Sequence, residues 1–202
     1  MPSTGDILIN GENFSHHSIR YRNTHGLSHI PEDRHKHGLV LDFDLQSNLV
    51  LQTFFESKFM KRGMLRFDKI KENATNLIKQ YDIRSASGPI TVARTMSGGN
   101  QQKAILAREI DRAHELLIAV QPTRGLDVGA SEFIHKQLIK ERDSGKAVLL
   151  VSLELDEVMD VSDRILVMYE GTIVTDVKPN EVTFQELGLY MSGSKRGAGY
   201  EN

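Results

Sequence analysis

Three short apolar runs, separated by two helical patterns, constrain the fold of this chain more than any other feature of its sequence. The runs cover residues 116–120, 147–151 and 164–168, and each is short enough to be a buried strand. Residues 130–142 and 156–161, which lie between them, have helical patterns. Because strand–helix–strand–helix–strand is the βαβ arrangement, the sequence predicts an α/β fold whose parallel sheet contains all three runs.

A paired-glycine turn, Ser97-Gly98-Gly99, stands directly before a strongly helical run. A helix start leaves backbone N–H groups without intrahelical partners and carries partial positive charge, so it attracts anions. Glycines there let an anion approach the backbone, and the Ser97 hydroxyl can cap the helix and donate to a phosphate oxygen. Taken alone, the string also fits a plain turn that caps a helix.

The first forty residues predict small elements. Residues 5–14 predict a β-hairpin, because a short apolar strand precedes the tight-turn pair Asn10-Gly11. Residues 26–30 predict a strand that ends at Pro31, since proline cannot continue a ladder. The charged residues 31–38 predict a solvated connection.

Two helices are predicted next. The first has Asp44 as its cap and runs to about Phe55, and the second covers residues 67–81 with an apolar stripe. Phe54, Phe55 and Phe59 form an aromatic cluster, which favours a place in the core over a binding surface.

The helix after the glycine pair is amphipathic. Leu106 and Ile110 share one face, whereas Arg108 and Arg112 lie elsewhere, so the helix is expected to dock on a core by its apolar face. The last part of the chain predicts a hairpin that ends with residues 172–177, a short helix that begins with a capping box at Thr183 and Glu186, and a disordered tail from Ser192.

Two histidine pairs raise the question of a metal site. His16 and His17 have no third ligand at helical spacing, so a surface loop is favoured there. A metal site from His35 and His37 stays an open alternative.

Composition narrows the function classes. The chain has 202 residues, of which 39% are hydrophobic and 26% charged, so it can bury a real core. A formal net charge of −2 argues against a nucleic-acid partner, and the absence of cysteine excludes a disulfide framework or a thiol site. No apolar run approaches the roughly 18 residues of a membrane span, and no signal peptide is recognised, so any membrane role is expected to be peripheral.

The longer string Met-Ser-Gly-Gly-Asn-Gln-Gln-Lys, residues 96–103, resembles the signature motif of ABC-transporter ATPases in the version typical of sugar and nucleoside importers. Pro-Glu-Asp-Arg at 31–34, Pro-Thr-Arg-Gly-Leu-Asp at 122–127 and Ser-Asp-Arg-Ile at 162–165 extend the resemblance over roughly residues 5–191.

The resemblance implies an ABC-type P-loop NTPase core, with a parallel sheet and flanking helices, joined to a helical signature subdomain. Residues 1–43 would be a remnant of the β subdomain with a Q-loop-like region, and 44–95 the helical subdomain. Residues 96–191 would hold the signature helix and the α/β core, and 192–202 the disordered tail.

In this family the signature contacts the γ-phosphate of ATP held by the phosphate loop of the other subunit. The resemblance therefore assigns contacts with ATP in trans to Ser97, Gly98, Gly99, Asn100 and Gln101, although Asn100 replaces the usual glutamine. It also places Asp127 in the D-loop, which acts across the dimer, and Glu32 where the family usually has the Q-loop glutamine.

The site that this half would build for itself departs from the family pattern in three places: Glu32, Val120 with Gln121, and Leu153. Val120 and Gln121 stand where the family has Asp-Glu, and Leu153 stands where it has the switch histidine. Valine offers magnesium no oxygen ligand, glutamine cannot accept the proton of an attacking water, and leucine cannot donate a hydrogen bond. No intact catalytic residue and no metal ligand is therefore expected in the site that this half would build for itself.

The phosphate-binding string Gly-x-x-x-x-Gly-Lys-Ser/Thr, which should open such a domain, does not occur in the sequence. The chain is therefore expected to be an N-terminally truncated fragment that lacks the Walker A loop. A native start at Met1 is the alternative.

The resemblance implies a nucleotide-binding half of an importer, on the cytoplasmic face of the membrane. It would complete the ATP site of the N-terminal ATPase half of the same polypeptide and contact the permease through the helical subdomain. ATP and Mg²⁺ would bind in the assembled transporter, with neither expected on the isolated chain.

Two other functions compete with this one. The chain could be an ABC-like interaction module without transport or ATPase activity, and an autonomous ATPase is the least supported interpretation. The solute, sugar or nucleoside, stays open. Loss of a strand would leave an exposed sheet edge, which would favour non-native self-association.

Overall fold

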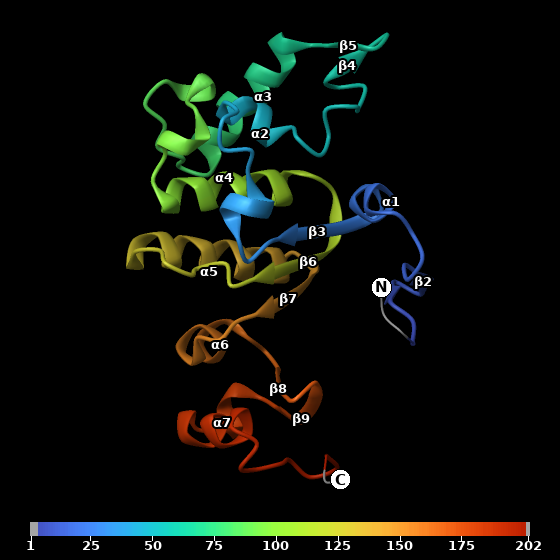
Figure 1. The fold of residues 1–202 in the computed structure, drawn as a ribbon, viewed down its shortest axis with the longest axis vertical. Coiled ribbons are helices and arrows are strands. Elements are labelled where there is room, and N and C mark those ends of the chain that lie inside the picture. Colours follow the sequence, from blue (N-terminus) through green and yellow to red (C-terminus); the bar gives the residue numbers. More distant parts are fainter. Residues whose placement is uncertain (1–3, 201–202) are drawn as a thin grey trace. The chain divides into compact units, whose positions relative to one another are not determined.

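The computed structural model describes residues 4–200, which fall into two compact units divided between residues 149 and 150. The first unit contains a mixed array of strands and helices from β1 to α5, and the second contains α6, β8, β9 and α7 (Figure 1). Each unit is described by itself. The finer boundaries expected at residues 43, 95 and 191 stay predictions.

A three-stranded sheet forms the centre of the first unit. Its order is β3 (Gly26–Ile30), β6 (His114–Val120), β7 (Ala147–Val151). β3 and β6 run parallel, with Leu27 opposite Leu116 and Ile30 opposite Ala119. The middle strand carries fully buried side chains, which explains why its sequence is a continuous apolar run.

The prediction that residues 164–168 join this parallel sheet is wrong. β8 (Ile165–Tyr169) pairs antiparallel with β9 (Thr172–Val177), and the third strand of the sheet is β3 instead. The apolar side chains of β8 are buried instead in the core of the second unit, where Ile165 and Val167 pack with Val174. The predicted hairpin is confirmed: Glu170 and Gly171 both have positive φ, 47° and 81°, and return the chain beside β8.

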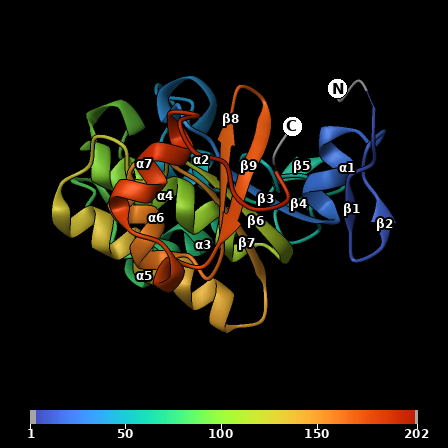
Figure 2. The same ribbon diagram turned by 90° about the horizontal axis from the view of Figure 1, so that it is seen from below.

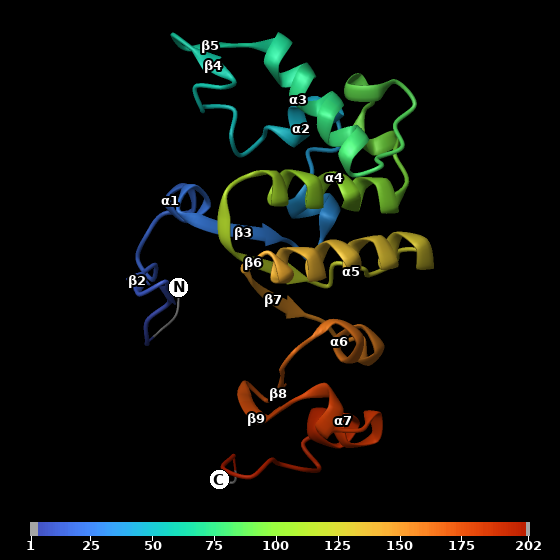
Figure 3. The ribbon, with the colours of Figure 1, turned by 180° about the vertical axis from the view of Figure 1, so that it is seen from behind.

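Two long helices pack in the first unit. α4 (Gly98–Asp111) contacts β3, β6 and α5 (Val128–Asp143), as Figure 3 shows. The side chains of Ile105, Leu106 and Ile134 on these helices are fully buried. Both helices were predicted, with ends within a few residues of those observed.

The helical part of the first unit consists of α2 (Leu45–Leu49), a small hairpin of β4 (Met60–Lys61) and β5 (Met64–Leu65), and α3 (Phe67–Gln80). The Asp44 cap and α3 are confirmed. The prediction that the first helix reaches Phe55 is wrong, because the chain after Leu49 winds in turns with hydrogen bonds three residues apart.

Of the three phenylalanines predicted to lie in the core, only Phe59 is buried. Phe59 is 3% exposed and packs with Val50 and Ile70. Phe54 is 38% exposed and meets Phe55 edge to face.

The N-terminal hairpin is confirmed as β1 (Leu8–Ile9) paired with β2 (Glu12–Asn13). A helix that the sequence did not predict, α1 (Ile19–Thr24), follows it. The predicted solvated connection at 31–38 is also wrong in part, because it contains a π-helix, η1 (Arg34–Gly38), capped by Asp33. Short 3₁₀ turns complete the chain: η2 (Gly88–Ile90), η3 (Ala93–Thr95) and, in the second unit, η4 (Pro179–Glu181).

The second unit packs α6 (Leu155–Val161) and α7 (Phe184–Met191) with the β8–β9 hairpin around a core of Ile165, Val167, Val174, Val182, Leu187 and Tyr190. Figure 2 shows α7 beside the hairpin. The predicted capping box between Thr183 and Glu186 is confirmed.

The tail is ordered where the structure describes it. Gly197 N–H donates to the carbonyl of Val174 at 2.8 Å, and Lys195 pairs with Glu186 at 2.9 Å. The predicted disorder from Ser192 is therefore wrong up to residue 200, and residues 201–202 lie outside the described chain. The physical reason is that these contacts hold the tail against β9 and α7, and glycine at 197 permits the close packing, since a Cβ there would lie 2.5 Å from Thr175 Oγ1.

Candidate functional site

The signature turn, Ser97-Gly98-Gly99, joins η3 to α4. Ser97 is the N-cap, with an extended backbone (φ −65°, ψ 155°), and Gln101 N–H donates to its carbonyl at 2.9 Å. The amides of Gly98, Gly99 and Asn100 precede that bond and so have no intrahelical acceptor. The start of a 14-residue helix therefore presents backbone donors beside an exposed serine, which suits an anion.

The two glycines also allow the turn to pack closely. A Cβ at position 98 would lie 3.1 Å from Nη2 of Arg34, and one at position 99 would lie 3.0 Å from the Cβ of Ala130. Sequence reasoning gave these glycines a role in anion approach and missed their packing role. The contacts come from η1 and α5, which are distant in sequence, so no local pattern could reveal them.

Asn100 points sideways from the first turn of α4. Its Oδ1 accepts from Arg84 N–H at 2.7 Å, and its Nδ2 donates to Ser97 Oγ at 2.8 Å. The amide therefore links the turn to the loop that precedes it.

Gln101 faces inward and is 4% exposed. Its Nε2 donates to the carbonyl of Ala93 at 2.9 Å, and its Oε1 lies 2.9 Å from Nε2 of His35. Because an amide oxygen only accepts, His35 carries its proton on Nε2 in this contact. The side chain of Gln101 thus fastens η1 to α4. Its backbone N–H is already bonded to the Ser97 carbonyl, so neither group is left to donate to a ligand.

The loop that precedes η1 is tied to the loop after β6. Glu32 pairs with Arg124 at 2.6 Å, and Arg34 Nη1 donates to the carbonyl of Arg124 at 3.0 Å. Both members of the ion pair are more than half exposed, so the pair adds little stability. Its effect on the site is to hold the Glu32 carboxylate on Arg124.

Asp127 is the N-cap of α5. Its Oδ1 accepts from Ala130 N–H at 2.8 Å, and its Oδ2 would lie 3.8 Å from a Cβ at position 99. Asp127 and the signature turn are therefore neighbours, which the sequence analysis did not predict.

Val120 and Gln121 end β6 and begin a tight turn. Gln121 has a positive φ of 49°, and its carbonyl accepts from Arg124 N–H at 3.2 Å. Gly125, also at positive φ, completes the turn. No carboxylate stands at either position, so the end of this strand does not fit a magnesium ion.

Leu153 lies in the second unit, between β7 and α6, and is 75% exposed. The neighbouring Ser152 hydroxyl accepts from Glu154 N–H at 3.0 Å and so shapes the turn. The exposed leucine side chain offers no polar contact to a phosphate.

Among residues 4–200, no group of three or more histidine, cysteine, aspartate or glutamate residues is placed to hold a metal ion. Asp33 has a structural role, since hydrogen bonds from the amides of Lys36 and His35 lower the pKa of its carboxyl.

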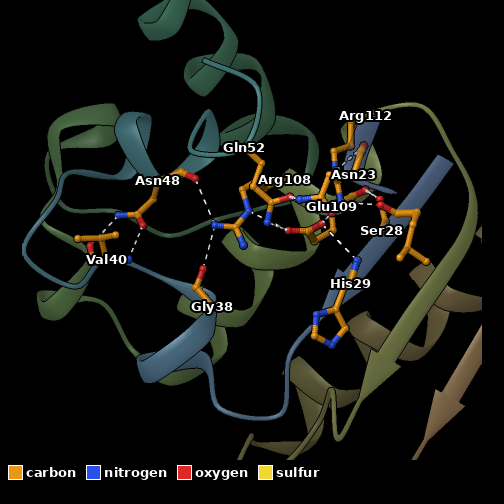
Figure 4. A network of polar contacts seen from close by, with 11 residues as sticks. Asn23, Ser28, His29, Gly38, Val40, Asn48, Gln52, Arg108, Glu109 and Arg112 are labelled. Carbon is orange, nitrogen blue, oxygen red and sulfur yellow. Dashed lines mark hydrogen bonds and ion pairs between the residues drawn. The ribbon is translucent and has the colours of Figure 1, made fainter. Parts of the chain in front are cut away.

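A buried ionic network, which the sequence did not predict, lies at the far end of α4 (Figure 4). Glu109 is fully buried and pairs with Arg108 at 3.0 Å and with Arg112 at 2.6 Å. Gln52 Nε2 donates to Glu109 at 3.0 Å, and His29 N–H does so at 3.3 Å. The expectation that the two arginines lie away from the core face is therefore wrong.

The network joins α4 to three other parts of the first unit. Arg108 Nη1 donates to the carbonyls of Gly38 at 2.8 Å and Asn48 at 3.4 Å, and Ser28 Oγ donates to the Glu109 carbonyl at 2.7 Å. The helix that carries the signature turn is thereby fixed to β3, to η1 and to α2. The only sequence signal was an Arg-Glu pair within a helix that is otherwise apolar on one side.

Comparison with known proteins finds relatives among the ATP-binding proteins of importers. No protein-family model matches it. It is 52% identical over 98% of its length to the guanosine import ATP-binding protein NupO of Bacillus subtilis, and 48% identical over 94% to the nucleoside import ATP-binding protein NupA of Lactococcus lactis. It is also 35% identical over 95% to the ribose import ATP-binding protein RbsA of Bacillus subtilis. The chain spans 39%, 37% and 38% of the lengths of these relatives.

Solved structures agree on the fold. The dimeric ATP-binding cassette MJ0796 in a post-hydrolysis state, bound to ADP and Pi, matches with a TM-score of 0.72 at 20% identity, over 88% of this chain and 75% of that one. The cassette MJ1267 in its ADP conformation matches with a TM-score of 0.69 at 14% identity, over 94% and 74%. Among residues 4–200, no helix combines the length and apolarity needed to cross a bilayer. The chain therefore has the fold of an ATP-binding cassette and is homologous, over about two fifths of their length, to the ATP-binding proteins of nucleoside and sugar importers.

Proposed function

We propose that this chain is a nucleotide-binding half of an ABC importer that contributes its signature turn, in trans, to the ATP site of a partner half. The observation that carries the proposal is the start of α4, where amides without intrahelical acceptors, the exposed Ser97 and the neighbouring Asp127 stand together. Those donors suit the terminal phosphate of a nucleotide held elsewhere.

The site that this half would build for itself is hydrolytically weak. Val120 gives magnesium no ligand, Gln121 cannot act as a general base, and Leu153 cannot donate to a phosphate. Glu32 is a fourth such position, because its carboxylate is paired with Arg124 rather than left to bind magnesium. ATP and Mg²⁺ would thus be held mainly by residues of the partner half.

The partner is the N-terminal ATPase half of the same polypeptide. The relatives are more than twice as long as the stretch that they share with this chain, which leaves room for such a half. The assembled pair would lie on the cytoplasmic face of the membrane.

The segment that precedes α2 and the chain from the end of η2 supply a surface for the permease. Phe43, Ile90 and Val92 are 49%, 60% and 40% exposed, and they lie close together because Ala93 N–H donates to the Phe43 carbonyl at 3.0 Å. An exposed apolar patch of this kind suits a coupling segment of a membrane subunit.

A nucleoside is the solute that the comparisons favour. The two nucleoside importer proteins share 52% and 48% identity with the chain, against 35% for the ribose importer protein. Competition between labelled guanosine and ribose in an uptake assay would decide between them.

Association with the partner half tests the proposal. Sedimentation of this chain with the matching N-terminal half should show a complex that depends on ATP, and Ser97→Arg should abolish both the complex and solute uptake, because the longer side chain fills the turn. Ser144→Arg is the matched control, since Ser144 caps the opposite end of α5, about 26 Å along that helix from Asp127.

Normal association and uptake by Ser97→Arg would contradict the proposal. Stable association with soluble proteins, without ATP and without a permease, would favour the interaction-module function instead.

A further inference from the structure

Asn100 is held from two sides at the start of α4. Arg84 N–H donates to its Oδ1 at 2.7 Å, and the loop that carries Arg84 is itself anchored, because Lys103 Nζ donates to the carbonyl and to Oδ2 of Asp82 at 2.9 and 3.0 Å. The hydrogen bond from Lys103 also lowers the pKa of the Asp82 carboxyl. The amide of Arg84 is thus a fixed donor for Asn100.

The chemistry of these partners determines which way the Asn100 amide points. A backbone N–H can only donate, so the side-chain oxygen must face Arg84 and the NH₂ group must face Ser97. The Ser97 oxygen therefore accepts, at 2.8 Å.

This arrangement leaves the hydroxyl proton of Ser97 for a ligand. A serine N-cap usually accepts from a backbone amide of the first turn, but Ser97 makes no such bond. Within residues 4–200, its hydroxyl group has one hydrogen bond, as acceptor from Asn100. Ser97 and Asn100 also line an open hollow of about 410 Å³ with Arg84 and Thr95, so the hydroxyl can be reached from outside.

We propose that Asn100 is a positioning residue, which holds Ser97 so that its O–H donates to the terminal phosphate of the nucleotide bound by the partner half. The proposal rests on the proposed function, because only a ligand in trans needs that donor.

A double-mutant cycle in the assembled transporter tests the coupling between the two residues. The variants are Ser97→Ala, Asn100→Ala and the double variant, and kcat and KM for ATP are measured for each. Asn100→Ala should lower kcat/KM about tenfold when Ser97 is present and should cause no further loss when Ser97 is already alanine. Ser144→Ala is the control, since Ser144 lies after the C-terminal end of α5, far from the hollow, and it should leave turnover within about twofold.

Asn100→Asp separates the positioning role from a purely structural one. A carboxylate still accepts from Arg84 N–H, so hydrogen exchange at that amide should stay slow, whereas Asn100→Ala should accelerate it. The carboxylate also accepts a hydrogen bond from the Ser97 hydroxyl, which can then no longer donate to a phosphate. Turnover should therefore fall although the Arg84 loop stays in place. Repeating Asn100→Asp with Ser97→Ala measures the effect of the added charge alone, and the loss should then be smaller.

Equal losses for Asn100→Ala with and without Ser97 would overturn the positioning role while leaving the proposed function in place. Normal turnover of Asn100→Asp would do the same. Unchanged turnover of Ser97→Ala would overturn both proposals, because the signature hydroxyl would then serve no nucleotide.

Discussion

Replacing Glu109 by glutamine perturbs the buried network without changing its shape. The wild-type carboxylate is fully buried and accepts from Arg108, Arg112 and Gln52 at 2.6–3.0 Å. Glutamine has one oxygen in place of two and adds an NH₂ group that must face a guanidinium. Two buried cations would then lack their counter-ion.

The size of the effect follows from burial. Arg108 and Arg112 side chains are 2% and 8% exposed, so water cannot replace the lost charge. Removing one partner of a buried ion pair costs about 3–5 kcal/mol. For a chain of this length the midpoint of thermal unfolding should fall by on the order of 10 °C.

Urea unfolding followed by circular dichroism measures this free energy directly. Glu132→Gln is the matched control, because Glu132 forms an exposed pair with Lys136 at 3.5 Å, and it should change stability by less than about 0.5 kcal/mol. A Glu109→Gln variant as stable as that control would show that the buried ion pairs do not contribute to stability in this way.

Three further predictions follow from the described residues. Gly38→Ala should destabilise the first unit by about 1–3 kcal/mol, because the new Cβ would lie 2.5 Å from the Ile105 side chain of α4. Gly188→Ala in α7 meets nothing within 4 Å and should stabilise the protein by about 0.5–1 kcal/mol, and urea unfolding of the two variants compares them. Arg164 lowers the pKa of the Asp176 carboxyl through a hydrogen bond. The pair therefore stabilises the folded state above the ordinary carboxyl pKa, and this stabilisation is lost as the pH falls through the lowered pKa. Arg164→Gln should raise the Asp176 pKa in an NMR titration, and an unchanged pKa would contradict this. Leu149, 48% exposed on the outer strand β7, should promote self-association of the isolated chain, and Leu149→Lys should reduce it in sedimentation experiments.

The strands show what a sequence of this kind reveals. β3 and β7 begin and end where predicted, because short apolar runs bounded by glycine, proline or polar residues specify strands locally. Pairing is different: the predicted β8–β9 hairpin forms, but β8 is not in the parallel sheet, because its apolar side chains are buried in a core made by the second unit alone.

The sequence predicted the turn of the candidate site but not the contacts that hold that turn in place. The position of Ser97 as N-cap followed from turn chemistry. The contact of Arg34 with Gly98 and the burial of Arg108 and Glu109 depend on partners from other parts of the chain. Charged residues are normally exposed, so a pattern alone assigns them to the surface.

The central claim is that this half activates the ATP site of its partner while its own site is inert. Steady-state ATP turnover by the assembled pair tests it most directly. The account predicts that Ser97→Arg abolishes turnover, whereas Gln121→Ala leaves it unchanged. Turnover that survives Ser97→Arg and is lost in Gln121→Ala would contradict it.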